Sequence, residues 1–90
     1  MRSIALALLL AASPAFAIQF VDGDLTVKLS DAECQNPMLL MSLAQFGAVK
    51  AATVTYAGTT VGACWAETEG KVILADDFGR AGFILRERFQ

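Results

Sequence analysis

The stretch KAATVTYAGTTVGACWAETEGKVILA, residues 50–75, decides the fold of this chain. Apolar side chains alternate along it with polar or small ones, and β-branched residues are frequent, which is typical of β-strands. Two turn signals, Ala57-Gly58 and Glu69-Gly70, divide the stretch. The sequence therefore predicts three consecutive antiparallel strands over residues 50–57, 59–67 and 71–75, joined as hairpins.

A two-residue turn at Ala57-Gly58 also sets which residues of the first two strands face each other. It places Val54 opposite Val61, Ala52 opposite Ala63, and Ala51 opposite Cys64. Lys50 then lies opposite Trp65 on the same face, where a cation–π contact is worth about 0.5–1 kcal/mol at an exposed site. The next turn places Trp65 opposite Leu74.

Both faces of this predicted sheet lack the charged residues of a solvated surface. One face carries Val54, Val61, Ala63, Trp65, Val72 and Leu74, and the other carries Ala51, Gly62, Cys64, Ala66, Ile73 and Ala75. A sheet with one solvent-exposed face alternates apolar with polar residues along its strands. Because this pattern is absent here, we expect both faces to be buried against other parts of the structure. A helix fits the small-residue face. The Trp65 face is covered either by curling of the sheet, with an N-terminal hairpin across it, or by a partner or second copy.

Upstream, Asn36-Pro37 marks the start of a helix, because Asn is a good N-cap and Pro is favoured at the first helical position. The predicted helix covers residues 38–46, and Gly47 follows it where a C′ glycine is expected. Its apolar face consists of Leu39, Leu43 and Phe46, with Leu40 and Met41 widening the stripe. A helix this short needs tertiary packing, which the small-residue face of the sheet offers.

The remaining segments complete a small α+β domain. Residues 18–21 and 25–29 predict an N-terminal hairpin around Asp22-Gly23-Asp24, and residues 30–33 are expected to form a loop. Residues 76–79 form a turn before a last strand at 81–85, and Phe89 is expected to anchor the charged tail. We therefore predict an antiparallel, curled sheet of about five strands, with one helix inserted after the second strand.

The first 17 residues have the order of a secretory signal peptide. One positive charge at Arg2 precedes the apolar run IALALLLAA at residues 4–12, and Ala15-Phe16-Ala17 fits a cleavage site. This run is too short for a membrane anchor, because crossing the hydrocarbon core takes about 20 apolar residues. We expect cleavage after Ala17, a single mature domain over residues 18–90 without a membrane span, and a periplasmic or secreted location.

Cys34 and Cys64 are the two cysteines of the chain. In an oxidising compartment they predict a disulfide, and only one pairing is possible. The bond would close a loop of about 30 residues, which the chain-entropy relation converts to roughly 3.5 kcal/mol of stabilisation. The alternative is a reactive thiol, which wants an activating neighbour such as histidine.

The composition argues against several classes of function. Seven Lys and Arg against nine Asp and Glu leave no basic footprint for a nucleic acid. The chain has no histidine, so it lacks the commonest metal ligand and the base of a serine hydrolase. The acidic residues fall in pairs at predicted turns or loops, namely Asp22/Asp24, Asp31/Glu33, Glu67/Glu69 and Asp76/Asp77. Arg80 occupies a ligand position of any calcium loop beginning at Asp76. We expect no catalytic residue, no metal and no cofactor.

Three side chains are candidates for binding a partner. Trp65, Tyr56 and Lys50 lie on the central strands, and aromatic residues dominate binding hot spots. For Trp65 the alternative is that the single tryptophan of a small domain fills its core. Arg80, Arg86 and Arg88 also make the end of an acidic chain locally basic, which fits either an interaction surface or a solvated tail.

Several short motifs resemble those of a known group of proteins. They are Leu25-Thr26 before Ser30-Asp31-Ala32-x-Cys34, Lys50-Ala51-Ala52-x-Val54, Ala63-Cys64-Trp65, and Val72-x-Leu74-x-Asp76 followed by Gly79 and Gly82-x-Ile84. With these motifs the chain resembles small exported proteins encoded in proteobacterial phages and prophages. The resemblance implies an envelope location and a phage–host role, and it brings no catalytic residues with it.

These observations predict a non-enzymatic, exported binding or inhibitor module that acts on the host envelope. Its expected partner is an envelope protein or a second copy of the chain. Two other functions stay open on the sequence alone, namely a small envelope enzyme that uses paired carboxylates and a self-associating structural protein.

Overall fold

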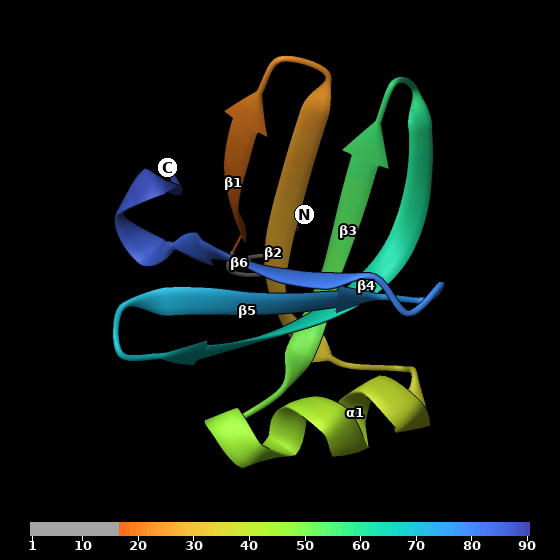
Figure 1. Cartoon of the computed structure of the whole chain (residues 1–90), viewed down its shortest axis with the longest axis vertical. Coiled ribbons are helices and arrows are strands. Elements are labelled where there is room, and N and C mark those ends of the chain that lie inside the picture. Colours follow the sequence, from red (N-terminus) through yellow and green to blue (C-terminus); the bar gives the residue numbers. More distant parts are fainter. Residues whose placement is uncertain (1–16) are drawn as a thin grey trace, which may run out of the picture.

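The computed structural model describes residues 17–90, so the predicted leader up to residue 16 lies outside the described part of the chain. Six strands and one α-helix are present (Figure 1). The strands are β1 (Ala17–Asp22), β2 (Leu25–Glu33), β3 (Lys50–Tyr56), β4 (Thr59–Thr68), β5 (Lys71–Asp76) and β6 (Ala81–Leu85). The helix α1 (Pro37–Leu43) and the 3₁₀ turn η2 (Ala44–Phe46) lie between β2 and β3, and the 3₁₀ turn η3 (Arg86–Arg88) follows β6.

The strands form one antiparallel sheet in sequence order, from β1 to β6. The expected strand count of about five was wrong, because β6 pairs with β5 along its whole length and is a full member of the sheet. The predicted register of the central strands is confirmed, with Lys50 opposite Trp65 and Trp65 opposite Leu74. The turn at Ala57-Gly58 is also confirmed, and both residues have positive φ, as the favoured two-residue hairpin turns require.

The sheet is curled, as predicted. Figure 1 shows β1, β2 and β3 side by side, while β5 and β6 run crosswise over them. The ten-residue strand β4 bends and belongs to both layers. The concave face of the sheet therefore closes on itself and buries one set of side chains between the two layers.

The inner core lies between these layers and contains the predicted Trp65 face. Its buried members are Val27, Leu29, Ala52, Ala63, Trp65, Val72, Leu74 and Phe89. Ile18 and Phe20 of β1 pack against them, so the N-terminal hairpin covers this face. The tail is anchored as expected, since the Phe89 ring lies 5.8 Å from that of Phe20. Gln90 adds backbone hydrogen bonds in both directions with Gln19.

The outer core lies under α1, on the small-residue face of β4 and β5. It contains Cys34, Leu39, Leu43, Cys64, Ala66 and Ala75, with Phe46, Val49 and Ile73 at its margin. The Cys34–Cys64 disulfide is confirmed and ties the start of the helical segment to β4. Leu40 and Met41 do not widen the buried stripe as predicted. Both are exposed, because the small contact area on β4 and β5 admits only the face that carries Leu39 and Leu43.

The helix is shorter than predicted. Asn36 caps it as expected, and Pro37 occupies its first turn, but the α-helical part ends at Leu43. The 3₁₀ turn η2 then tightens the chain before Gly47 (φ 135°), a conformation that favours glycine. This turn places Phe46 at the margin of the outer core. Within residues 17–90, no helix is long and apolar enough to cross a membrane.

The predicted loop at residues 30–33 is instead part of β2. The register against β3 shifts between Leu29 and Glu33, which is the mark of a bulge. At the bulge, Ser30 forms two long-range hydrogen bonds. Its hydroxyl donates to the Ala51 carbonyl at 3.1 Å, and its own carbonyl accepts the indole N–H of Trp65 at 3.0 Å. A local pattern without apolar alternation could not reveal this long-range pairing.

Candidate binding groove

The three residues predicted to bind a partner do not share one surface. Lys50 lies 6.0 Å from the centre of the Trp65 ring and forms an ion pair with Asp31. The Trp65 side chain is buried in the inner core, with only 5% of the residue exposed. Tyr56, which is 64% exposed, lies at the other end of β3, about 20 Å away along the strand.

Tyr56 lies instead on a groove between the two layers of the sheet. One wall of this groove is β6, and the opposite wall is formed by Leu25 and Val27 of β2 and Val54 and Tyr56 of β3. We call this hollow, of about 380 Å³, the β6 groove. Figure 1 shows that β6 crosses over β2 and β3, the strands whose residues form the opposite wall. Apolar side chains form most of its wall.

A second hollow of about 290 Å³ continues along the same strand. It shares Phe83 and Ile84 with the β6 groove and extends to Phe20 of β1 and Arg88 of η3. The two hollows together follow β6 over its whole length. The two hollows therefore adjoin each other along this strand.

The turn between β5 and β6 anchors the guanidinium of Arg80 at one end of the β6 groove. Asp76 is buried, and its Oδ2 accepts a hydrogen bond from Nε of Arg80 at 2.7 Å. Its Oδ1 accepts from the backbone N–H groups of Phe78 and Arg80 at 3.0 and 2.9 Å. The Arg80 side chain is 72% exposed, so its guanidinium is anchored by Asp76 while facing solvent at the rim of the groove.

The same contacts set the ionisation of Asp76. Burial raises the pKa of its carboxyl, but the hydrogen bonds from Arg80 and Phe78, together with the charge of Arg80, outweigh burial and hold the pKa below its ordinary value. Asp76 is therefore ionised at neutral pH and serves as the anchor of the turn. A proton donor would need the opposite shift.

Asp76→Ala is expected to lower the free energy of unfolding by about 1–2 kcal/mol at pH 7, because it removes the acceptor of three hydrogen bonds. Since the folded pKa of Asp76 is depressed, its stabilisation is complete above the ordinary Asp pKa of about 3.9 and is lost as the pH falls through the folded value. Urea unfolding of both proteins at pH 7 and at lower pH should show the difference shrink in acid. A difference that grows in acid would contradict this role.

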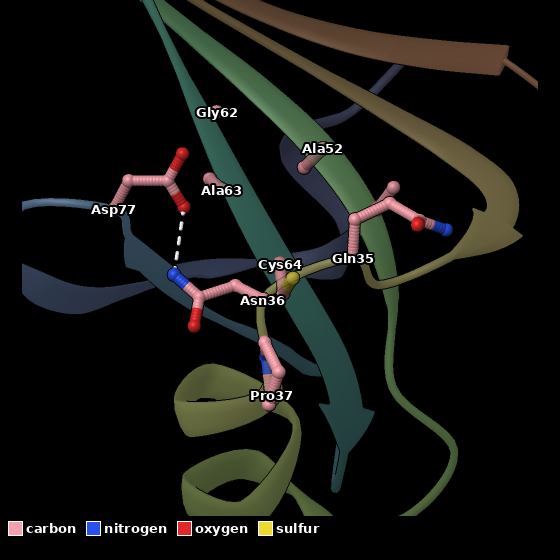
Figure 2. Close-up of a pocket in the computed structure, with 9 residues that line it drawn as sticks. Gln35, Asn36, Pro37, Ala52, Gly62, Ala63, Cys64 and Asp77 are labelled. Atoms are coloured by element: carbon pink, nitrogen blue, oxygen red, sulfur yellow. Dashed lines mark hydrogen bonds between the residues drawn. The ribbon is translucent and has the colours of Figure 1, made fainter.

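A larger groove of about 530 Å³ lies on the outer face, beside the start of α1 (Figure 2). Ala51, Gly62 and Cys64 contribute to its lining, and its polar lining residues are Gln35, Asn36 and Asp77. Asn36 uses its side-chain oxygen to cap α1 through Met38 and Leu39, and its Nδ2 donates to Oδ1 of Asp77 at 3.0 Å.

Gly62 brings the β5–β6 turn close to this outer face. A Cβ built on Gly62 would lie 2.6 Å from Oδ2 of Asp77, and the Asp77 N–H donates to the Gly62 carbonyl at 2.9 Å. The polar side chains around this outer-face groove thus connect α1, β4 and the β5–β6 turn to one another. We assign it a structural role as the joint between α1 and the sheet.

The other acidic pairs lie at turns or strand ends, and the structure does not gather them into one centre. Asp31 pairs with Lys50, and Glu67 pairs with Arg86 at 3.5 Å. Among residues 17–90, no group of three acidic or cysteine side chains is arranged to hold a metal ion. A comparison with protein-family models, curated proteins and solved structures finds no match to the chain.

Sequence reasoning missed the β6 groove because its lining residues look like ordinary core positions. Val54 and Leu25 fit the inner-face pattern, yet both are only partly buried and lie at the open end of the curl. One signal was available in Ala81-Gly82, where small residues in a strand leave space that neighbouring side chains do not fill. No heavy atom lies within 4 Å of a Cβ built on Gly82.

Proposed function

We propose that this chain is an exported, non-enzymatic binding or inhibitor module of the periplasm or the extracellular space. The β6 groove is its binding site. The observation that carries the proposal is an open, mostly apolar groove on a compact scaffold, with an anchored arginine at its rim. Binding sites in proteins are typically concave and apolar, with a few placed polar groups.

The scaffold supports this function because it holds the groove walls in place. The wall formed by β2 and β3 belongs to the same sheet as β6, and the inner core lies beneath both. The aromatic side chain of Tyr56, which lines the groove, is 64% exposed. Exposed aromatic residues on a rigid surface are favourable anchors for a partner.

The partner that we propose is a protein of the bacterial envelope. The signal-like leader and the disulfide fit a protein that works outside the cytoplasm. The resemblance to small phage and prophage proteins adds a host envelope protein as the target class. A groove of this size matches a segment of a partner better than a whole folded face.

Export is tested by the mass of the protein recovered from the periplasm of cells that express the whole chain. We expect a mature start at Ile18 and a mass two hydrogens below that of the fully reduced chain. Protein found in the cytoplasm with residues 1–17 still attached would contradict the proposed location.

Gly82→Leu tests the groove itself. The substitution projects a side chain into the open space at Gly82, and we expect the fold to be kept because no atom stands in the way. Wild type should capture a specific partner from a periplasmic extract, and Gly82→Leu should lose it. Ala48→Leu, an exposed position outside the groove, is the matched control and should retain the partner. Equal capture by all three proteins, or no specific capture by wild type, would contradict the proposal.

A further inference from the structure

The outer edge of β6 presents backbone groups that no described strand uses. β6 is the last strand of the sheet and pairs on one side only, with β5. The N–H of Asp76 donates to the carbonyl of Arg80, and the N–H of Arg86 donates to that of Gly70. These bonds fix the alternation between the two strands, so the backbone groups of Gly82 and Ile84 point toward β5. Those of Ala81, Phe83 and Leu85 point outward.

The outward groups face the β6 groove and its continuation. Both hollows are lined by residues of β6, and the opposite wall is set back on β1, β2 and β3. Gly82 keeps the middle of this path open on the inner side, where Ile84 and Leu74 pack into the core. The edge therefore combines hydrogen-bonding groups, an apolar wall and unfilled space.

We propose that the partner binds by adding an extended strand to the outer edge of β6. This inference rests on the proposed binding function and names the ligand class, a protein segment of about five residues in the β conformation. Alternate side chains of the added strand would lie on Leu25 and Val54, and its backbone would pair with Ala81, Phe83 and Leu85. Main-chain pairing gives affinity in this mode, and the pockets for alternate side chains give specificity.

The charge at the groove specifies the segment further. Arg80 lies at one end with its guanidinium exposed and held by Asp76 through Nε, and a guanidinium carries five N–H donors. A carboxylate on the bound segment would complement it. Each end of the path carries one arginine and one aspartate, Arg80 with Asp76 and Arg88 with Asp22, and the exposed N–H donors of the anchored Arg80 are the ones that we assign to the segment's carboxylate. The preferred ligand is thus an apolar, β-prone segment with an acidic residue near one end.

A second copy of the chain fits this edge less well. If two β6 strands paired antiparallel about Phe83, Arg80 of each copy would face Arg86 of the other. Like charges directly opposite each other destabilise a strand pair. Self-pairing in this register is therefore disfavoured, and sedimentation tests self-pairing in the others.

The probe for this proposal is a blocked heptapeptide of alternating valine and threonine with a glutamate at one end. Hydrogen exchange followed by NMR should show new protection of the Ala81, Phe83 and Leu85 amides when the peptide is added. The Gly82 and Ile84 amides should change little, because they already bond to β5. Replacing the peptide's glutamate with glutamine should weaken binding several-fold. No new protection at about 1 mM peptide, a concentration that detects even weak complexes, would overturn the proposal.

The variant Phe83→Pro distinguishes the contribution of backbone pairing to peptide binding from that of side-chain contacts. Proline removes the outward N–H of residue 83 and leaves the bonds of Gly82 and Ile84 to β5. We expect Phe83→Pro to bind the peptide at least tenfold more weakly than the control Phe83→Thr, which loses the same aromatic ring but keeps the N–H. Methylating alternate peptide nitrogens tests the same point on unaltered protein. Methyl groups on one alternating set should abolish binding, and those on the other should be tolerated.

The failure of this inference is distinguishable from failure of the proposed function. A partner that is lost with Gly82→Leu but kept by Phe83→Pro uses the groove without strand addition, which overturns the inference alone. A partner that is kept by both variants overturns the function and the inference together. Sedimentation that shows dimers of the wild type and monomers of Phe83→Pro would identify self-pairing and also overturn the inference.

Discussion

Trp65→Ala should lower the free energy of unfolding by about 3–5 kcal/mol, the range for truncating a large buried aromatic residue. The side chain lies in the inner core between the two layers of the sheet, so its removal leaves a cavity that both layers border. Its indole N–H also bonds to the Ser30 carbonyl at the bulge of β2. Urea unfolding followed by circular dichroism measures the change, since Trp65 is the single tryptophan and fluorescence is lost with it.

Trp65→Phe is the matched control for this variant. Phenylalanine keeps much of the apolar volume but offers no donor to the Ser30 carbonyl. We expect a loss of about 1–3 kcal/mol, between wild type and the alanine variant, because an unsatisfied acceptor and a smaller cavity remain. An alanine variant within about 1 kcal/mol of wild type would show that the inner core does not depend on this side chain.

Removing the disulfide should have an effect of similar size. The Cys34→Ala, Cys64→Ala double variant is expected to lose roughly 3.5 kcal/mol, because the bond closes a loop of 30 residues in the unfolded chain. Thermal unfolding should show a clearly lower Tm. Reductant should lower the Tm of wild type toward that of the double variant and leave the variant unchanged. Equal Tm values for oxidised and reduced wild type would contradict a stabilising role.

The loss should also be uneven across the molecule. The disulfide ties the segment before α1 to β4, and the seven-residue helix packs through only Leu39 and Leu43. A helix of this length does not persist without tertiary contacts. Hydrogen exchange should therefore accelerate most in α1 when the bond is reduced, while β1 and β2 keep more of their protection.

Much of the fold could be predicted because its signals are local. The turns at Ala57-Gly58 and Glu69-Gly70 fix the register of β3, β4 and β5, and apolar residues on both faces require the curl and the helix. The cap at Asn36 and the single cysteine pair are equally local. The tail residue Phe89 followed the simple expectation that an isolated aromatic side chain will be buried.

The remaining features depend on contacts between distant residues. At the bulge after Leu29, Ser30 forms hydrogen bonds with Trp65 and Ala51 across the sheet, and the residues near position 30 do not encode these contacts. Leu40 and Met41 are apolar and lie in the predicted helical segment. They are exposed because the helix contacts β4 and β5 over a small area only. The strand at residues 81–85 was predicted correctly, but the total of about five was one short, because membership of the sheet depends on the pairing of β6 with β5.

The candidate site was harder to predict than the fold. Trp65 was predicted as a candidate binding residue, with the core as the alternative, and the structure places it in the core. Tyr56 does lie on a groove, but its neighbours there come from β6 and the β5–β6 turn, which are more than 20 residues away in the chain. Composition identifies the residue types that bind partners, while the curl of the sheet decides which of them reach a common surface.

The sequential order of the strands also has a consequence for folding speed. Four of the five strand pairings join neighbours across turns of two to four residues, so these hairpins need little loop-closure entropy. Only β2 and β3 are brought together over a longer connection, the one that contains α1. Short loop closures of this kind favour rapid folding. The slowest structural step we expect is the meeting of β2 with β3, which also brings Ser30 within reach of Ala51.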